Sequence, residues 1–410
     1  MPTVEEHRAT TRALLAPLAE RAPEMWVSAK PPRGGQRRVL ATDLVTPIDL
    51  PPFDNSQMDG YAVRSSEIAP GTEFAVAARI RAGSASPQVL PPGSAAPIMT
   101  GAPVPDGADA IIPIEAATPS FFQPEETGTT VAFGATVAPG TFVRPRGSDL
   151  PAGSLLFPAG TVLGPAQWGA IASAGIRDVP LLRPLRVLLL STGDELTVPG
   201  EALERGHIND SNAASMSVAI AETGALVQDS LVIPDDPKAL RRVFSGEGPG
   251  PDLVLTTGGV SVGAYEVVRD VFEQIGVEFL TVAMQPGGPQ GAGIASIGTF
   301  RGPVVAFPGN PVSALVSFEI FLRPVLRALH GLSADRPSWT APLAAELTSP
   351  PAKHQVRRGV ISPDGAVHLV GGPSSHLLHS YAASTVLVHV PVGVAHLDKG
   401  DPVEVWSIDE

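Results

Sequence analysis

The chain has 410 residues, a length that predicts more than one domain. Its formal net charge of −13 at pH 7 argues against a nucleic-acid-binding surface, because phosphate backbones are bound by net positive charge. The chain contains no cysteine, which excludes disulfides, thiolate metal ligands and a cysteine nucleophile, and which fits a reducing cytoplasm.

The N-terminal segment predicts a helix instead of a targeting signal. Residues 4–20 place Leu14, Leu15 and Leu18 on one helical face. The segment lacks the basic and apolar regions of a signal peptide, and no apolar run in the chain approaches the roughly 20 residues that span a bilayer. We therefore expect a cytoplasmic protein with neither a membrane nor a nucleic-acid partner.

The region after this helix predicts a loop and then a mostly β domain. A basic cluster at Arg33, Arg37 and Arg38 favours a solvated loop. Residues 46–145 are dense in proline, glycine and branched residues, as is typical of β domains. Short strands are expected at 73–81, 109–114, 130–133 and 141–143.

Polar side chains gather in three stretches of the β domain. Residues 54–63 and 99–115 are, taken alone, more typical of Asx turns and loops than of a site. Farther along, Arg144, Arg146 and Asp149 lie close together. This arrangement suits either a clamp for a phosphate or an ordinary surface loop.

An α/β pattern follows. Buried strands at 186–191, 253–255 and 304–307 alternate with helices, which predicts a doubly wound, mainly parallel sheet. The loops after these three strands should meet at one edge and bind a ligand outside the carboxyl ends. Residues 334–410 lose helical periodicity and predict a small β barrel or sandwich, with strands at 354–361, 366–370, 386–391 and 402–406.

The three loops have features of an anion site. Gly193 follows the first strand. Gly258 and Gly259 follow the second, where glycine permits positive φ and close approach of a ligand to the main chain. After the third strand, Asn310 is expected to cap a helix over 312–329.

Carboxylates occupy the same loops. Glu195, Asp235 and Glu266 would repel a phosphate unless a cation lay between them, and Mg²⁺ is the natural bridge. An alternative role for Glu266 is to stabilise its helix through the dipole. Asp236 is expected to cap the helix over 238–244, which leaves Asp235 free.

The motifs for other chemistries are missing. There is no Ser-His-Asp pattern, no Walker A motif and no dinucleotide fingerprint after a strand. His376 and His379 are more typical of a surface loop than of a metal site. A set of carboxylates without a nucleophile indicates chemistry assisted by a metal ion. The reaction would be attack on an anhydride or release of one.

Together these motifs resemble the MoeA family of molybdopterin molybdenumtransferases, which includes the E domain of gephyrin. The resemblance covers nearly the whole chain and rests on the order and spacing of the motifs. They are DNSQMDGYAV (54–63), TGAPVP with GADAIIPIE (100–115), RGSDL (146–150), STGDEL (191–196), HINDSN (207–212), DDP (235–237), TTGGVSVG (256–263) and PGNPVSA (308–314).

The resemblance implies an activity. Family members take adenylylated molybdopterin and molybdate and, with a divalent cation, insert molybdenum and release AMP. It also implies homodimers, whose site lies between the α/β part of one subunit and the β parts of the other, and a molybdopterin adenylyltransferase as a possible partner.

The resemblance further implies an elongated subunit of four parts, combining the doubly wound α/β domain with a mostly β inserted domain and a C-terminal β-barrel-like domain. The expected boundaries are 1–25 for a helix that packs on the α/β domain, 26–45 with 146–180 for a linker domain, 46–145 for the inserted domain, 181–333 for the molybdopterin-binding domain and 334–410 for the C-terminal domain.

Site residues are carried over from the family position by position. The acidic, catalytic positions fall on Asp59, Asp149, Glu195, Asp235 and Glu266. Of these, Glu195, Asp235 and Glu266 are the expected metal ligands. The positions expected to bind the pterin or nucleotide are Thr100, Arg144, Arg146, Gly193, Gly258, Gly259, Ser261, Pro308, Gly309, Asn310 and Pro311.

Some positions depart from the family pattern. Glu266 stands where the family usually has Asp, and it adds a methylene to a metal ligand. Gln285 and Gly288 replace lysines that could hold molybdate or a phosphate, and the usual asparagine near 380–386 is absent. These departures leave one alternative, a weakened paralogue that binds molybdopterin or acts as a scaffold. A second alternative, insertion of tungsten, stays open because tungstate and molybdate have the same shape and charge. The arginines that could compensate are Arg144, Arg146, Arg357 and Arg358.

Overall fold

The computed structural model describes residues 1–21, 23–27, 38–81, 83, 89–123, 128–246, 249–260 and 266–409. Two compact units make up the chain: Met1–Glu24, Gly34–Val39 and Leu182–Glu410 form the first, and Met25–Arg33 and Leu40–Leu181 form the second. No helix within the described ranges is long and apolar enough to cross a membrane. The expected basic loop cluster at Arg33 and Arg37 lies outside the described residues.

A six-stranded sheet in the order β18-β15-β19-β23-β22-β20 forms the centre of the first unit. The first four strands run parallel, whereas β22 is antiparallel to β23 and β20 is antiparallel to β22. The predicted mainly parallel α/β domain is therefore confirmed, with two antiparallel strands at one end. The strands are β15 (Arg186–Thr192), β18 (Leu226–Ile233), β19 (Leu253–Thr257), β20 (Val277–Thr281), β22 (Pro289–Ile297) and β23 (Phe300–Phe307).

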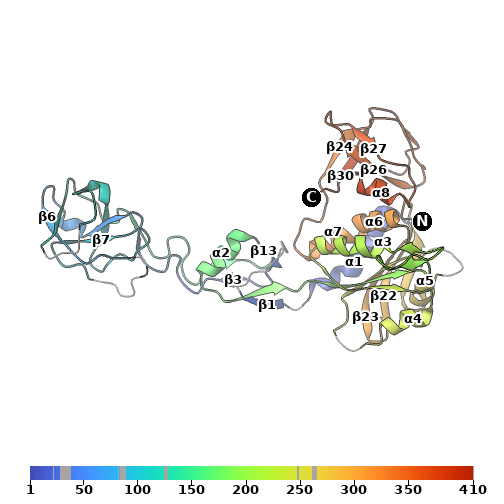
Figure 1. The fold of residues 1–410 in the computed structure, drawn as a ribbon, viewed down its shortest axis with the longest axis horizontal. Helices are drawn as coiled ribbons and strands as arrows, with labels where there is room; N and C mark the ends of the chain where they lie inside the picture. Colours follow the sequence, from blue (N-terminus) through green and yellow to red (C-terminus); the bar gives the residue numbers. More distant parts are fainter. Residues whose placement is uncertain are drawn as a thin grey trace. The chain divides into compact units, whose positions relative to one another are not determined.

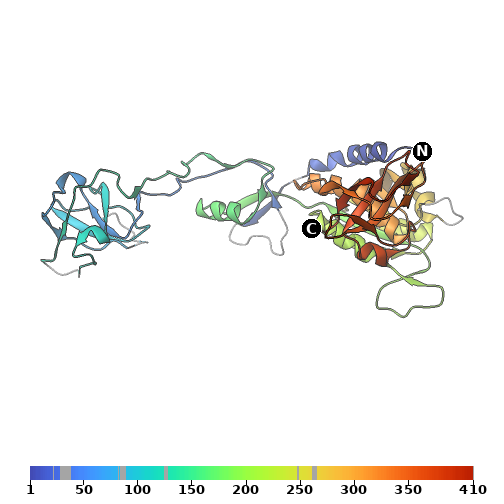
Figure 2. The same cartoon turned by 90° about the horizontal axis from the view of Figure 1, so that it is seen from above.

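Helices cover both faces of this sheet, because successive strand residues point to opposite sides. Leu188 and Leu190 of β15 pack with α4 and α5, whereas Val187 and Leu189 pack with α1, α3, α6 and α7. Figure 1 shows the two helical layers on either side of the sheet, and Figure 2 shows the same unit from above. The helices are α1 (Val4–Leu15), α3 (Ser211–Glu222), α4 (Pro237–Val243), α5 (Val267–Phe272), α6 (Pro311–Ser317) and α7 (Arg323–Leu329).

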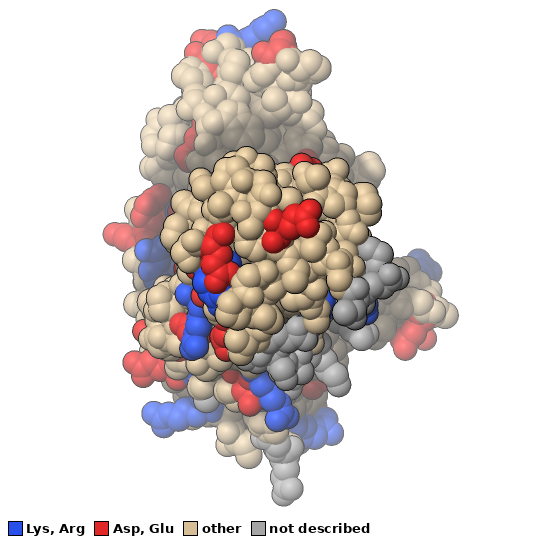
Figure 3. Space-filling model, turned by 90° about the vertical axis from the view of Figure 1, so that its left-hand side faces the viewer, with Lys and Arg blue, Asp and Glu red and all other residues tan. Residues whose placement is uncertain are grey.

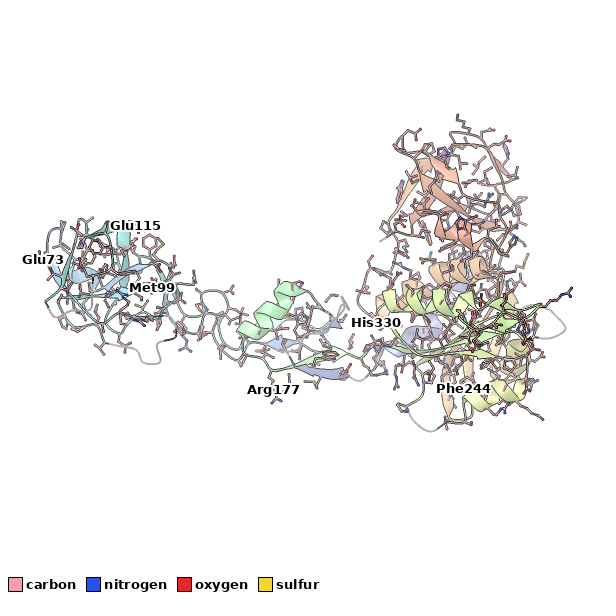
Figure 4. All side chains as sticks on the ribbon, viewed as in Figure 1. Glu73, Met99, Glu115, Arg177, Phe244 and His330 are labelled. Carbon is pink, nitrogen blue, oxygen red and sulfur yellow. The ribbon has the colours of Figure 1, made fainter. Side chains whose placement is uncertain are left out.

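Aromatic rings close the core on the α4 side. Phe244, labelled in Figure 4, directly follows α4 and is buried. Its ring centroid lies 6.2 Å from that of Phe272 and 5.6 Å from that of Phe300. These contacts join α4, α5 and β23 into one apolar cluster.

The predicted helix over 312–329 is interrupted. A π-helical segment, Phe318–Leu322, separates α6 from α7. Pro324 follows it, and proline has no N–H to donate to the carbonyl four residues earlier. A wider π turn accommodates that missing bond without ending the helix. Sequence periodicity alone showed only the continuous apolar face.

The C-terminal part of the first unit is a β structure, as predicted. Its main sheet has the order β21-β26-β28-β30-β24, and the short β27 also pairs with β26. β21 and β26 run parallel, which ties this sheet to the α/β part of the chain. The strands are β21 (Met284–Gln285), β24 (Ser338–Pro342), β25 (Leu347–Thr348), β26 (His354–Ile361), β27 (Val367–Leu369), β28 (Val386–Val390), β29 (His396–Leu397) and β30 (Pro402–Ser407), with helix α8 (Leu378–Ala382).

A second six-stranded sheet, in the order β8-β5-β7-β6-β10-β9, forms the inserted β part of the second unit. Alternate residues of β5 point to opposite faces of the sheet and pack in two hydrophobic clusters. Tyr61 and Val63 belong to one cluster, and Ala62 belongs to the other. The strands are β5 (Gly60–Val63), β6 (Glu73–Val76), β7 (Ser94–Ile98), β8 (Ala110–Pro113), β9 (Ala117–Thr118) and β10 (Thr130–Phe133).

The strand expected at 73–81 ends early, at Val76. The carbonyl of Pro97 in β7 accepts from the Ile80 N–H at 2.7 Å, so this edge of Pro97 faces the β6 side. Proline has no N–H to donate on that edge, and pairing beyond Val76 is reduced to a single bridge between Ile80 and Ile98. The remaining elements of this unit include β3 (Leu44–Val45), β4 (Asn55–Ser56), β11 (Val143–Arg144), β12 (Leu155–Phe157), β13 (Val162–Leu163) and α2 (Pro165–Ser173).

Candidate functional site

A cavity of about 850 Å³ lies in the first unit. Its lining includes the residues that follow β15, β19 and β23, three neighbouring parallel strands whose carboxyl ends lie at one edge of the sheet. The strand order thus places the three loops as expected for a doubly wound sheet. The expected site residues on the lining are Gly193, Glu195, Asp235, Gly258, Gly259, Glu266, Pro308, Gly309, Asn310 and Pro311.

Two glycines let the loops approach each other closely. Gly258 has φ +97°, and a Cβ at this position would lie 2.7 Å from the carbonyl oxygen of Thr192. Gly259 has φ +66°, and its Cβ would lie 2.9 Å from the side chain of Val268. Only glycine therefore fits both the backbone conformation and the space at these positions.

The third loop is anchored differently from the prediction. Asn310 precedes α6, but its side chain makes no capping hydrogen bond. Instead, the N–H of Val312 donates to the carbonyl of Ser375 at 3.1 Å. A loop from the C-terminal part thus satisfies a backbone donor in the first turn of the helix, and Ser375 itself lines the cavity.

Three carboxylates, Glu195, Asp235 and Glu266, line the same cavity. Asp194 Oδ1 accepts from the N–H of Asp235 at 3.0 Å. Burial raises the pKa of Asp235, and the negative charges of Asp194 and Glu195 raise it further. This excess of negative charge fits a bound cation.

These carboxylates do not form a preformed metal cage. In the part of the chain that the structure describes, no three His, Asp or Glu side chains are close enough together to hold a metal ion. A cation here would be held by one or two carboxylates, with ligand oxygens and water completing its shell, as is usual for Mg²⁺.

Two polar side chains at the cavity, Asn212 and Thr192, were not predicted from the sequence. Asn212, near the start of α3, donates from Nδ2 to the carbonyl of Gly309 at 2.7 Å. Asn212 Oδ1 and Thr192 Oγ1 are buried without a hydrogen-bond partner among the described residues, and both residues line the cavity. These atoms are free to meet polar groups of a ligand. Asn212 stands in the HINDSN stretch, which was a usable signal.

The remaining expected site residues belong to the second unit. Asp59 Oδ1 accepts from Thr100 twice, from the backbone N–H and from the hydroxyl, at 2.7 Å each. The backbone donor first, and then the hydroxyl, lower the pKa of Asp59. Asp59 therefore stays ionised, with its orientation set by Thr100.

The expected arginine clamp has its own partners. Arg146 bonds to the carboxylate of Asp49 through Nε, and its N–H donates to Asp54 Oδ1 at 2.6 Å. Arg144 lies on β11, which pairs with β4, and Arg144 Nη1 donates to Asn55 Oδ1 at 3.4 Å. Residues 54–56 and 143–146 therefore lie side by side.

Two further expected site residues are Asp149 and Ser261. Asp149 is exposed, and its N–H donates to the carbonyl of Leu50 at 2.9 Å. Ser261, expected to bind the cofactor, lies outside the described residues.

The fold and the cavity define a doubly wound α/β domain with an acidic cavity at the carboxyl edge of its sheet, in a chain that also contains two β regions. Residues 2–175 match the MoeA N-terminal region (domain I and II), and residues 340–408 match the MoeA C-terminal region (domain IV). Residues 188–328 match a family described as "Probable molybdopterin binding domain".

Individual relatives match over most of the chain. Molybdopterin molybdenumtransferase 2 of Mycobacterium tuberculosis is 42% identical over 387 residues, covering 91% of this chain and 93% of the relative. Molybdopterin molybdenumtransferase of Haemophilus influenzae is 33% identical, covering 90% of each. The structure of the molybdopterin biosynthesis MoeA protein from Pyrococcus horikosii matches with a TM-score of 0.80 and 28% identity, covering 100% of this chain and 99% of that one. The chain belongs to the MoeA family of molybdopterin molybdenumtransferases, as the sequence motifs predicted.

Proposed function

We propose that this chain inserts molybdenum from molybdate into adenylylated molybdopterin, with release of AMP, in molybdenum cofactor biosynthesis. The observation that carries the proposal is the cavity at the carboxyl edge of the sheet, where glycine loops and three carboxylates meet. The family membership of the whole chain and the names of its relatives support the same activity.

In this proposal, the residues of the cavity bind and orient the substrate. Gly258, Gly259 and Gly309 line the cavity, and their main-chain groups would bind a phosphate of the substrate. The unpartnered oxygens of Thr192 and Asn212 meet polar groups of the ligand. Together they fix the anhydride in the cavity.

One or two of the carboxylates Glu195, Asp235 and Glu266 would hold a divalent cation, Mg²⁺ in this proposal, with ligand oxygens and water completing its shell. Such an ion, when bound, screens the charge that develops on the leaving phosphate. The raised pKa of Asp235 supports this assignment, because like charges that crowd one site are relieved by a cation between them.

Further parts of the proposal concern assembly and location. We propose a homodimer in which Asp59 and Asp149 of one subunit orient the pterin or molybdate of the other subunit's site. The paired Asp59 and Thr100 support this role, since the carboxylate is ionised and oriented. A molybdopterin adenylyltransferase partner, a cytoplasmic location and the domain boundaries expected from the sequence belong to the same proposal.

A second candidate is a molybdopterin-binding or scaffold protein with weakened catalysis. It is favoured by the loop over 284–289, where Gln285 and Gly288 line the cavity without contributing a charge. A third, tungstate-specific insertion, uses the same site, because tungstate has the same shape and charge as molybdate.

The test is AMP release from adenylylated molybdopterin, with and without molybdate, in the presence of Mg²⁺. Release that depends on molybdate and yields cofactor able to reconstitute an apo-molybdoenzyme supports insertion. Tight substrate binding without release supports the scaffold candidate instead. Replacing molybdate by tungstate in the same assay distinguishes the third candidate from the first, because tungstate-specific insertion requires AMP release with tungstate in place of molybdate.

A further inference from the structure

The cavity of the first unit is electrostatically one-sided. Its described lining carries three acidic residues, Glu195, Asp235 and Glu266, but a single lysine and no arginine. That lysine is Lys353, which stands in the C-terminal part of the chain, directly before β26. A cavity that handles phosphate and a metal oxyanion needs cationic donors, because charge-assisted hydrogen bonds are the strong ones.

Backbone contacts fix Lys353 beside the loop over 284–289. Its own N–H donates to the carbonyl of Pro350 at 3.1 Å, and the next N–H, of His354, donates to the carbonyl of Ala283 at 2.8 Å. The parallel pairing of Met284 with His354 continues this contact. The lysine is therefore held where its flexible side chain can reach into the cavity, and it is half-buried.

Two arginines, Arg357 and Arg358, hold a loop that lines the same cavity. Ser374 and Ser375 line the cavity. Arg357 Nη2 donates to the carbonyl of Gly371 at 3.2 Å, and Arg358 Nη2 donates to the carbonyls of Gly372 and Ser374. These bonds hold the loop that carries the serines.

Both arginines lie deep in the protein. Arg357 is 8% exposed and Arg358 is 1% exposed, and neither forms an ion pair with a described carboxylate. Their hydrogen-bond partners are backbone carbonyls. Two positive charges therefore lie behind the loop that carries the serines, and they add to the charge of Lys353.

We infer that Lys353 is the cationic contact of this cavity for a tetrahedral oxyanion, either molybdate or a phosphate of the substrate. The inference rests on the proposed function and names a residue that binds the oxyanion. Lys353 donates hydrogen bonds to the oxyanion, and the hydroxyls of Ser374 and Ser375 complete the donor set. Gln285 and Gly288 line the same cavity without a charge, so Lys353 is the cation on its described lining.

The test replaces Lys353 by methionine, which keeps the length of the side chain and removes the charge. Molybdate binding is measured by calorimetry, which needs no turnover. The affinity for adenylylated molybdopterin and the KM for molybdate in AMP release are measured alongside. We expect Lys353→Met to weaken one of these by roughly 10- to 100-fold, the effect of losing a charge-assisted hydrogen bond, and Lys353→Arg to retain most of it.

The arms distinguish the two oxyanions. Weaker molybdate binding with unchanged substrate affinity assigns Lys353 to molybdate, and the reverse assigns it to a substrate phosphate. If both affinities stay within about twofold of the wild type, the inference is wrong. A wild type that binds molybdate but releases no AMP overturns the proposed function and leaves the role of Lys353 measurable by calorimetry.

Two matched variants exclude a structural explanation. Lys399→Met removes an exposed lysine outside the cavity lining and should leave every readout unchanged. Gly288→Lys, added to Lys353→Met, places a charge elsewhere in the same cavity. A Cβ at Gly288 meets its nearest neighbours at 3.4 to 3.5 Å, which is ordinary contact, and its φ is not in the left-handed region. Recovery of oxyanion binding in the double variant supports a charge-based role, and equal loss in Lys353→Arg would contradict it.

Discussion

Asp59 and Thr100 form a two-point contact in the second unit: one carboxylate oxygen of Asp59 accepts both the backbone N–H and the hydroxyl of Thr100, at 2.7 Å each. The two residues come from separate polar stretches that look like ordinary turns when taken alone. Both bonds go to Oδ1, which fixes the direction of the carboxylate and leaves Oδ2 without a hydrogen-bond partner among the described residues. The contact makes Thr100 a positioning residue for Asp59.

Thr100→Val should therefore raise the pKa of Asp59 and lower AMP release by roughly fivefold to tenfold, on the order of 1 kcal/mol. The folded pKa of Asp59 is depressed, so the stabilisation is present above the unfolded value of about 4 and is lost as pH falls through the folded value. The free energies of unfolding of wild type and variant should converge at low pH. Urea unfolding over a range of pH measures this convergence and an AMP-release assay measures the loss of turnover, with Thr141→Val, which removes a hydroxyl bonded to the Ala138 carbonyl, as control for both.

Gly258→Ala should damage both stability and the cavity. The new Cβ would lie 2.7 Å from the carbonyl oxygen of Thr192, and φ at this position is +97°. Strain of this kind costs about 1–3 kcal/mol. Urea unfolding compares this variant with Gly250→Ala, whose added Cβ meets nothing within 4 Å. Equal effects of the two changes would show that the close approach of the loops is unimportant.

The neighbours Asp235 and Asp236 should respond in opposite ways. Asp236 Oδ1 accepts from the N–H of Lys238 at 2.9 Å and caps α4, so Asp236→Ala should cost about 0.5–2 kcal/mol of stability and spare turnover. Asp235→Asn removes a charge from the crowded carboxylates of the cavity and should abolish most turnover without lowering stability. Thermal unfolding and AMP release are measured on both variants. Loss of turnover in Asp236→Ala alone would contradict the assignment of the capping role to Asp236 and the catalytic role to Asp235.

Glu319→Ala should unfold the first unit far more readily. Glu319 is 6% exposed, and its carboxylate accepts from Arg336 Nε at 3.0 Å and Nη2 at 2.9 Å. Removing it from beside buried arginines costs about 3–5 kcal/mol. Glu273→Ala breaks the exposed pair with Arg269 and should cost less than about 1 kcal/mol. Denaturant midpoints of the two variants give the comparison, and similar midpoints would argue against a structural role for the buried pair.

Mg²⁺ should raise the melting temperature through the cavity carboxylates. A ligand that binds only the folded state stabilises it by about 2.7 kcal/mol at a hundredfold excess over Kd. Glu195→Gln and Glu266→Gln should each reduce the shift, whereas Glu278→Gln, an exposed position on β20, should not. Chelation should reverse the effect. A shift of equal size in all three variants would place the ion elsewhere.

On the face that Figure 3 shows, lysine and arginine side chains stand among acidic and uncharged residues, with no continuous basic area among the described residues of that face. A small anionic ligand held in one cavity does not require such a surface, because a few local donors are sufficient.

The sequence by itself determined three parallel strands of the first unit, β15, β19 and β23, and the edge of the sheet where the loops after them meet. Strands and glycine loops are encoded locally, through runs of branched residues and through positions such as Gly258 that admit positive φ, and parallel order then brings the loops to one edge. The cap at Asp236 is equally local and was correctly predicted.

Only the tertiary structure decided which distant segments complete the cavity. Lys353 and Ser375 come from the C-terminal part, and the pairing of β21 with β26 joins residues about 70 positions apart, for which no local periodicity exists. The carbonyl of Ser375, and not the side chain of Asn310, satisfies the N–H of Val312 for the same reason. Long-range pairing depends on the packing of whole sheets, and therefore the charge of the cavity could not be derived from its three loops alone.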